Sequence, residues 1–166
     1  MRFEPLPAIE QGECGTPAPI RLLRLPDGVE IVPAATVTCP AAEALGRWVL
    51  EAAGAEAEAQ LGTDLVGILN GTSYECRGQN RQAGAKLSEH AFANAFDVMG
   101  FRLRKRADIA VSAQAGETPE ARFVAAVRGG ACRYFSTVLG PGSDPAHADH
   151  LHLDLRARNR GVRLCQ

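Results

Sequence analysis

The end of the chain carries three closely spaced histidines, in the run His147-Ala-Asp-His150-Leu-His152. On a β-strand, residues two apart point to the same face, so the imidazoles of His150 and His152 would lie side by side. The fourth histidine, His90, lies in an earlier polar segment that ends at Asp97. Two histidines and one carboxylate around an open position are the donor set of a catalytic zinc ion. The sequence therefore predicts a metal-dependent hydrolytic chemistry.

Asp97 lies in an apolar run, between Phe96 and Val98. A carboxylate there is costly unless it is paired or binds a metal, with a hydrogen bond to nearby backbone as the simpler alternative. The spacing from His90 to Asp97 suits one face of a helix poorly and favours a turn that leads into a strand. Asp149 or Asp154 can accept the outer imidazole N–H of a histidine ligand.

A zinc ion with three protein ligands keeps a position for water, whose pKa it lowers to about 7. Attack of such a water on a carbonyl develops an oxyanion, which needs a donor that stays protonated. Arg77 is the candidate donor, because it follows a buried strand from whose end a side chain can project; a surface salt bridge is the alternative. A neutral histidine can serve as the general base.

Length and composition restrict the class of protein. A chain of 166 residues with 46% hydrophobic residues predicts one domain over residues 1–166, with residues 1–40 as an N-terminal extension packed on it. The net charge of −1 argues against a nucleic-acid-binding surface. No stretch reaches the ~20 apolar residues of a transmembrane helix, so we expect no integral membrane segment, and we expect a monomer.

The five cysteines are scattered and contain no C-x-x-C pair. This spacing favours disulfides in an oxidising compartment over a structural zinc site, with buried free thiols in a cytosolic protein as the alternative. An odd count leaves one cysteine over, and a pairing of Cys76 with Cys132 is attractive because each flanks a segment near the predicted site. The scattered cysteines therefore lead us to expect a periplasmic or secreted protein. No apolar leader region follows Met1, so the expectation includes a signal peptide that has been removed.

The elements that must position these residues indicate an α+β fold. Two short strands are expected at residues 20–25 and 29–32, around the turn Pro26-Asp27-Gly28. The clearest helix covers residues 41–60, with Pro40 in its first turn and Gly62 as its stop, and a second helix follows Thr118. Further strands are expected at 65–70, 95–103, 108–111 and 150–155, a loop at 78–86 and a solvated basic tail at 156–163. Together they predict a small central antiparallel sheet that carries the metal site, with helices packed around it.

Two segments resemble the lysostaphin/D-Ala-D-Ala metallopeptidase/hedgehog (LAS) superfamily of zinc peptidases, which shares an S-x-H-x-x-G-x-A-x-D segment and a later H-x-H. The first reads Ser88-Glu-His90-Ala-Phe-Ala93-Asn-Ala-Phe-Asp97, with Ala93 where glycine is usual, and the second is His150-Leu-His152. Over nearly its full length the chain also resembles the bacterial extensin-like C-terminal domain family. That resemblance includes Ser73-Tyr-x-Cys-Arg77, Ala131-Cys-Arg-Tyr-Phe-Ser-Thr-Val-Leu-Gly-Pro and the run from His147 to Leu155.

The resemblance implies roles for single residues. It implies that His90, Asp97 and His152 bind Zn²⁺, that His150 assists the water or stabilises the transition state, and that His147 lines the site. Contacts to the substrate are expected from Arg77, Ser88 and Tyr74. The D-Ala-D-Ala branch places a glutamate shortly before its last histidine ligand, whereas this chain has Asp149 three positions before His152. We therefore favour His150 as the base over Asp149 or His147.

The function that the resemblance implies is a zinc-dependent peptidoglycan hydrolase. It would cleave a peptide bond in the stem peptides or cross-links of the wall, as a D,D-endopeptidase or D,D-carboxypeptidase. The alternative is a non-catalytic cell-wall-binding or regulatory domain that retains the metal-binding fold. A zinc-stabilised structural domain is a weaker third hypothesis, because a structural zinc site normally has a fourth protein ligand.

Overall fold

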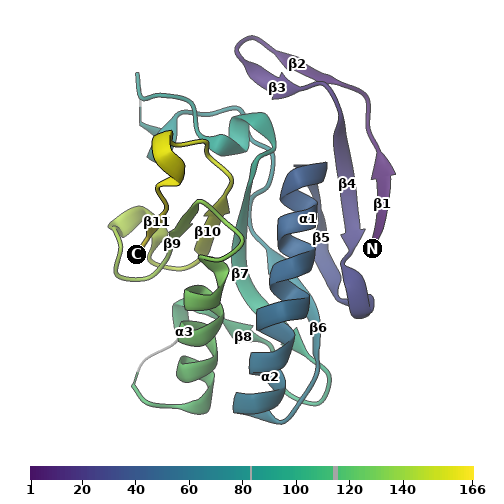
Figure 1. Ribbon diagram of the computed structural model, residues 1–166, viewed down its shortest axis with the longest axis vertical. Coiled ribbons are helices and arrows are strands. Elements are labelled where there is room, and N and C mark those ends of the chain that lie inside the picture. Colours follow the sequence, from purple (N-terminus) through teal and green to yellow (C-terminus); the bar gives the residue numbers. More distant parts are fainter. Residues whose placement is uncertain (83, 114–115) are drawn as a thin grey trace.

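The computed structural model describes residues 1–82, 84–113 and 116–166, which form an α+β architecture (Figure 1). Nine strands of these residues make one sheet in the order β1-β4-β5-β6-β7-β10-β9-β11, with β8 paired to β7. Their bounds are β1 Arg2–Pro5, β4 Pro19–Arg24, β5 Glu30–Thr38, β6 Leu65–Asn70, β7 Ala95–Leu103, β8 Ile109–Ala110, β9 Thr137–Leu139, β10 Leu151–Asp154 and β11 Leu164–Cys165. A separate hairpin consists of β2 (Ile9–Gln11) and β3 (Cys14–Thr16). Residues 1–40 thus supply three strands of the main sheet.

The sheet that the described residues form has nine strands and is mixed, so the prediction of a small antiparallel sheet is wrong both in the size of the sheet and in the direction of its strands. Strands β5 and β6 run parallel, as do β9 and β11, whereas β10 pairs antiparallel with both β7 and β9. The parallel pair follows from the long helical connection between β5 and β6, because such a crossover returns the chain to the same edge of the sheet. The pair that carries the predicted ligands, β7 and β10, is antiparallel as expected.

The helical crossover comprises α1 (Cys39–Trp48), a π-helical segment (Val49–Ala53) and α2 (Gly54–Leu61). Thr38 caps it by accepting a hydrogen bond from the Ala41 N–H, and Gly62 ends it in the left-handed conformation. The predicted helix over 41–60 is confirmed. The second predicted helix is α3 (Pro119–Ala131), capped by the Thr118 side chain.

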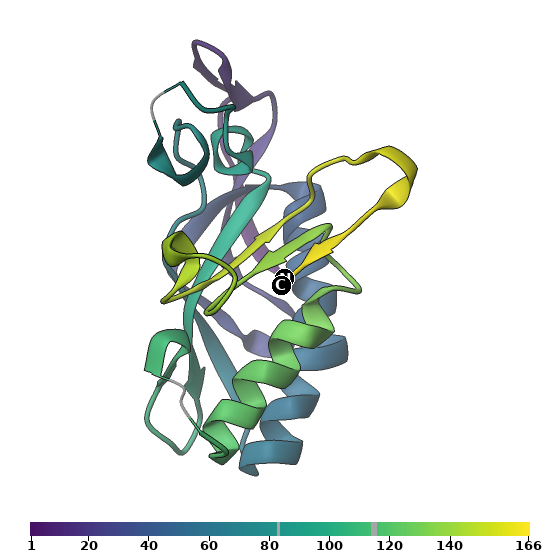
Figure 2. The same ribbon diagram turned by 90° about the vertical axis from the view of Figure 1, so that its left-hand side faces the viewer.

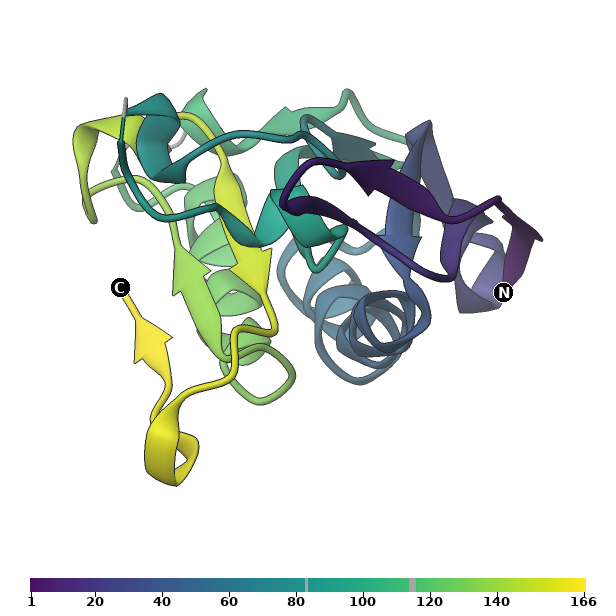
Figure 3. The ribbon, with the colours of Figure 1, turned by 90° about the horizontal axis from the view of Figure 1, so that it is seen from above.

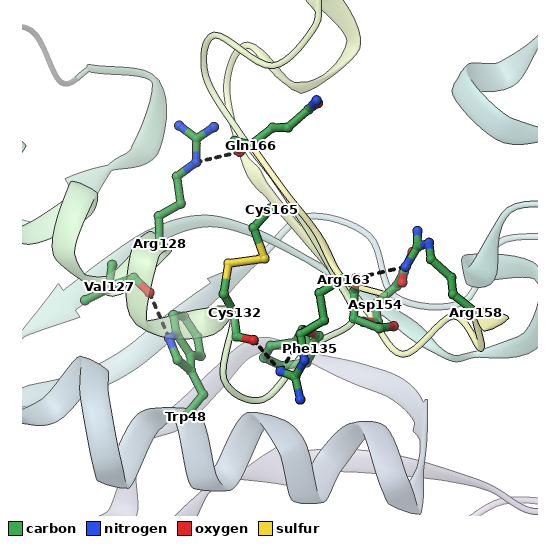
Figure 4. Close-up of a disulfide and its surroundings, with 11 residues drawn as sticks. Trp48, Val127, Arg128, Cys132, Phe135, Asp154, Arg158, Arg163, Cys165 and Gln166 are labelled. Atoms are coloured by element: carbon green, nitrogen blue, oxygen red, sulfur yellow. Dashed lines mark hydrogen bonds between the residues drawn. A yellow bond between two sulfur atoms is a disulfide. The ribbon is translucent and has the colours of Figure 1, made fainter. Parts of the chain in front are cut away.

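The helices lie side by side against one face of the sheet (Figures 1, 2 and 3). Trp48 is fully buried between them and the strands, tilted against Phe101 and edge-on to Phe135. Its indole Nε1 donates to the Val127 carbonyl oxygen at 3.0 Å and so connects α1 to α3 (Figure 4). Among the described residues, no helix has the length and apolar character needed to cross a membrane.

All five cysteines lie in described parts of the chain, and two disulfides join Cys14 to Cys76 and Cys132 to Cys165. The predicted pairing of Cys76 with Cys132 is wrong. Cys14 on β3 meets the loop that contains Cys76, and β11 beside β9 brings Cys165 to the end of α3 (Figure 4). Cys39, at the start of α1, is free and exposed.

The strands predicted at 20–25, 29–32, 65–70, 95–103, 108–111 and 150–155 are confirmed as β4, β5, β6, β7, β8 and β10. In the loop predicted at 78–86, Gln79–Arg81 form a 3₁₀ turn, and Ala83 lies outside the described residues. The tail predicted to be solvated is held at several points, among them Arg163, which donates to the Cys132 and Phe135 carbonyls. Arg158 donates to the Ser136 carbonyl at 2.8 Å and to the Thr137 hydroxyl at 2.7 Å.

Candidate metal centre

Strand pairing and one short turn bring the three predicted ligands together. Asp97 on β7 lies opposite His152 on β10 in the strand register, and His90 lies in the 3₁₀ turn Glu89–Phe92 just before β7. Asp97 Oδ1 is 3.1 Å from His90 Nε2 and 3.0 Å from His152 Nδ1, and these two nitrogens are 3.2 Å apart. All three residues are buried. The predicted turn from His90 into the strand of Asp97 is confirmed.

The turn that holds His90 depends on its two ends. The Ser88 hydroxyl accepts a hydrogen bond from the His90 N–H, and Ala93 closes the turn with a φ of 53°. This left-handed conformation favours glycine, and here an alanine adopts it. The Ala93 carbonyl then accepts from the Thr38 N–H at 2.8 Å, so the turn is also fixed to the start of α1.

The outer nitrogens of the two histidines are both hydrogen-bonded to groups that only accept. His90 Nδ1 donates to the Ser73 carbonyl at 2.7 Å, and His152 Nε2 donates to Asp154 Oδ2 at 3.1 Å. When both imidazoles are neutral, their ring protons therefore lie on the outer sides, and the lone pairs of His90 Nε2 and His152 Nδ1 face Asp97. Three electron-pair donors around one point repel each other unless a metal cation or a proton lies among them.

The pKa values of the cluster agree with this requirement. Burial would raise the pKa of Asp97, but hydrogen bonds from His152 and His90 hold it well below its usual range. Burial would lower the pKa of His152, but hydrogen bonds to Asp154 and Asp97 overcome it and raise the value to about 9. Without a metal ion, a proton on His152 supplies the positive charge at neutral pH.

The residues fit a divalent cation, and zinc in particular. Imidazole nitrogens and a carboxylate oxygen are common zinc ligands, and bonds of 2.0–2.1 Å in a tetrahedral site would place ligand atoms about 3.3 Å apart. The observed separations of 3.0 to 3.2 Å are close to that spacing. Within the described residues, the group that could hold a metal ion consists of His90, Asp97 and His152, which leaves a fourth position open.

Two further imidazoles flank the centre. His150 Nε2 lies 3.7 Å from Asp97 Oδ1, on the same side as His152, while its Nδ1 donates to Asp149 Oδ1 at 2.8 Å. Leu151 between them is fully buried, so the predicted orientation of the H-x-H pair is confirmed. The ring centroid of His147 lies 5.5 Å from that of His152.

A cleft of about 550 Å³ opens beside these residues, and Asp97, His150 and His152 contribute to its wall. Arg77 and Ser88, both predicted to contact substrate, also line it. Arg77 Nε donates to Glu75 at 2.9 Å, so the salt bridge considered as the alternative for this residue is present on the cleft wall itself.

Tyr74, the third residue expected to contact substrate, is engaged elsewhere. Its hydroxyl donates to Gln11 Oε1 in the hairpin β2–β3 at 3.0 Å. The hairpin is joined to the same loop by the disulfide between Cys14 and Cys76. A substrate contact by Tyr74 stays a prediction, and the hydroxyl would have to leave Gln11 to make one.

Three groups that hold the site were not predicted from the sequence. The Ser73 carbonyl fixes His90, Glu75 fixes Arg77, and Asp144 accepts from His147 Nδ1 at 2.8 Å. A backbone carbonyl has no signature in sequence, and Glu75 reaches Arg77 only through the path of the loop. Asp144 alone had a signal, because an aspartate before a proline is a common first residue of a helical turn.

Comparison with known proteins gives one match. A family model described as "Extensin-like protein C-terminus" matches residues 1–166, which is the whole chain. Searches of curated proteins and of solved structures found nothing that matches it.

Proposed function

We propose that this chain, which belongs to the extensin-like protein C-terminus family over its whole length, is a zinc-dependent hydrolase of peptide bonds in peptidoglycan. The proposal includes kinship with the LAS zinc peptidases. The observation that carries it is the convergence of three possible ligand atoms on one point. The outer hydrogen bonds of His90 and His152 leave two nitrogens and Asp97 facing one point beside an open cleft.

The remaining polar groups suit hydrolysis of an amide. When bound, zinc would supply a water that is acidic near neutral pH and would polarise the scissile carbonyl. His150 Nδ1 donates its proton to Asp149, so the lone pair lies on Nε2, which is near Asp97 and placed to take the proton of that water. The Arg77 guanidinium lines the cleft, where it would donate to the oxyanion that develops on the carbonyl.

The substrate class rests on the family and on the compartment. Two disulfides are consistent with an extracellular or periplasmic protein, where peptidoglycan lies. An open fourth position favours a catalytic over a structural role for the metal, because structural zinc sites are normally closed by protein ligands. The reaction we propose is D,D-endopeptidase or D,D-carboxypeptidase cleavage.

The test is digestion of purified muropeptides, analysed by liquid chromatography and mass spectrometry. Zinc-loaded wild-type protein should release shortened or uncross-linked peptides, and a chelator should abolish the release. Asp97→Ala, prepared in the same way, should behave like the chelated protein. Chromatograms that are unchanged with zinc-loaded, folded wild-type protein would remove the hydrolase proposal.

A non-catalytic wall-binding domain is the second candidate, and one observation favours it. Asp97 already forms ion pairs with His90 and His152, and Asp154 forms one with His152. The side chains of the cluster therefore have partners even without a metal ion or a substrate. His150→Ala and Arg77→Ala separate the two functions. If both variants keep wall binding and the cellular phenotype, binding is the function.

A further inference from the structure

The two imidazoles that flank the centre are held in different ways. Asp144 Oδ1 accepts three hydrogen bonds, from the N–H groups of Ala146 and His147 at 2.8 and 3.1 Å and from His147 Nδ1 at 2.8 Å. It thereby caps the 3₁₀ turn Pro145–His147 and fixes the ring of the last residue in that turn. One carboxylate oxygen sets both the backbone and the side chain of His147.

The neighbouring pair lacks this support. Asp149 holds His150 Nδ1 at the same distance of 2.8 Å, but the Asp149 side chain is 63% exposed, against 35% for Asp144. Water competes more effectively for an exposed carboxylate, so the ring of His150 is less firmly oriented by its partner. His147 is also buried, and its ring packs 5.3 Å from that of His150 and 5.5 Å from that of His152.

The bond to Asp144 decides which nitrogen of His147 is available. A carboxylate only accepts, so the proton lies on Nδ1 and the lone pair on Nε2, at the far edge of the ring. Both Asp144 and His147 line the cleft beside the candidate metal centre. A peptide presents an amide N–H at each ordinary residue, which is the complementary donor.

We propose that Asp144 is a positioning residue for the hydrolysis. It fixes the Nδ1–H tautomer of His147, so that Nε2 accepts a hydrogen bond from an amide N–H of the peptide substrate next to the scissile bond. This inference rests on the proposed function, because the substrate is the peptide whose cleavage is proposed above.

Asp144→Ser is the variant that isolates this role. Serine caps a helical turn about as well as aspartate, but its hydroxyl is too short to reach the imidazole as the carboxylate does. We expect zinc-loaded Asp144→Ser to lose about tenfold or more in kcat/KM on muropeptides, as is typical when the partner that orients a site histidine is removed. The zinc affinity should stay within about threefold of wild type, because His147 is outside the ligand set.

Nuclear magnetic resonance of ¹⁵N-labelled histidines supplies a readout that does not depend on turnover. The ¹⁵N shifts of His147 should report a proton on Nδ1 in wild type and a mixture of tautomers in Asp144→Ser. Asp149→Ser is the matched comparison and should cause a smaller loss of kcat/KM. Asp64→Asn, which alters an exposed ion pair with Arg104, should match wild type.

The outcomes separate this inference from the proposed function. A wild-type protein that cleaves no muropeptide overturns the hydrolase, and the inference with it. An active wild type in which Asp144→Ser keeps the His147 tautomer, or loses no more kcat/KM than Asp149→Ser, overturns the inference alone. A loss of zinc affinity that parallels the loss of kcat/KM would also overturn it, since Asp144 would then support the fold of the centre and not His147.

Discussion

At the scale of single residues, Asp97 is the side chain on which the centre depends. It is the shared partner of His90 and His152, and its carboxylate is the one negative ligand of the group. We expect Asp97→Ala to lower the zinc affinity by more than about 100-fold, since even partners that only orient a ligand contribute 10–100-fold. Competition with a chromophoric chelator and metal analysis of the purified protein measure this.

Asp64→Asn serves as the matched control for that substitution, because its carboxylate pairs with Arg104 at an exposed position. It should bind zinc like wild type. One equivalent of zinc retained by Asp97→Ala at wild-type affinity would contradict the assignment of the ligand.

His152 gives the metal-free protein a defined pH dependence. Its pKa in the folded state is raised to about 9 from 6.5, so the folded state holds this proton more tightly than the unfolded state does. The resulting stability is fully present below pH 6.5 and is lost as the pH rises through about 9, at about 1.4 kcal/mol per pH unit. The pKa of Asp97 is lowered in the folded state, so its carboxylate stabilises the fold at higher pH. This stabilisation is lost as the pH falls below 3.8, the ordinary pKa of an aspartate.

Urea denaturation between pH 6 and pH 9 tests this prediction in chelator and in zinc. The free energy of unfolding should fall with pH in chelator. In zinc the cation replaces the proton, so the fall should disappear. Parallel curves under the two conditions would show that no metal replaces the proton at this centre.

The sequence could predict these residues because their types are rare and their spacing is informative. Four histidines fall in two short segments, and an aspartate inside an apolar run needs a partner. The carboxylates that accept hydrogen bonds from these imidazoles were harder to predict from the sequence. Asp154 was one of two candidates to accept an imidazole N–H, and it holds His152, whereas Asp149 holds His150. Which carboxylate meets which ring depends on the path of the chain and not on spacing alone.

At the scale of elements, Trp48 connects the crossover helix to α3 and to the sheet. Trp48→Phe keeps an aromatic ring against Phe101 and Phe135 but removes the donor to the Val127 carbonyl. The lost hydrogen bond and the smaller ring should together lower the free energy of unfolding by about 1–3 kcal/mol. Urea denaturation followed by far-ultraviolet circular dichroism measures the change.

Leu50→Ala is the control for this helix, because Leu50 is 45% exposed in the turn after Trp48. It should change the stability by no more than about 0.5 kcal/mol. Equal losses in the two variants would mean that the helix, and not the buried indole, determines the effect.

At the scale of the whole molecule, the sequence predicts the elements better than their arrangement. Alternating and helical patterns locate β6, β7, β10, α1 and α3, because each depends on residues close in the chain. The sheet order depends on connections. The 23 residues of helix from Cys39 to Leu61 make β5 and β6 parallel, and this consequence was not drawn from the sequence. The pairing of the cysteines was predicted wrongly for the same reason, because the disulfides join segments that only the folded sheet brings together.

The two disulfides hold the hairpin β2–β3 and the C-terminal strand β11 against the rest of the molecule. Non-reducing peptide mapping should find Cys14 with Cys76 and Cys132 with Cys165, and Cys39 should react with an alkylating reagent before reduction. The bridged residues are 62 and 33 positions apart, so serine substitution of either pair should cost about 2–4 kcal/mol of stability.

Only the loss of the first pair, Cys14 and Cys76, should also weaken zinc binding. Cys76 lies three residues after Ser73, whose carbonyl orients His90, whereas the second pair anchors the C-terminal strand. Cys39→Ser should leave stability and zinc affinity unchanged, and equal zinc affinities in the two double variants would contradict the link between the hairpin β2–β3 and the centre.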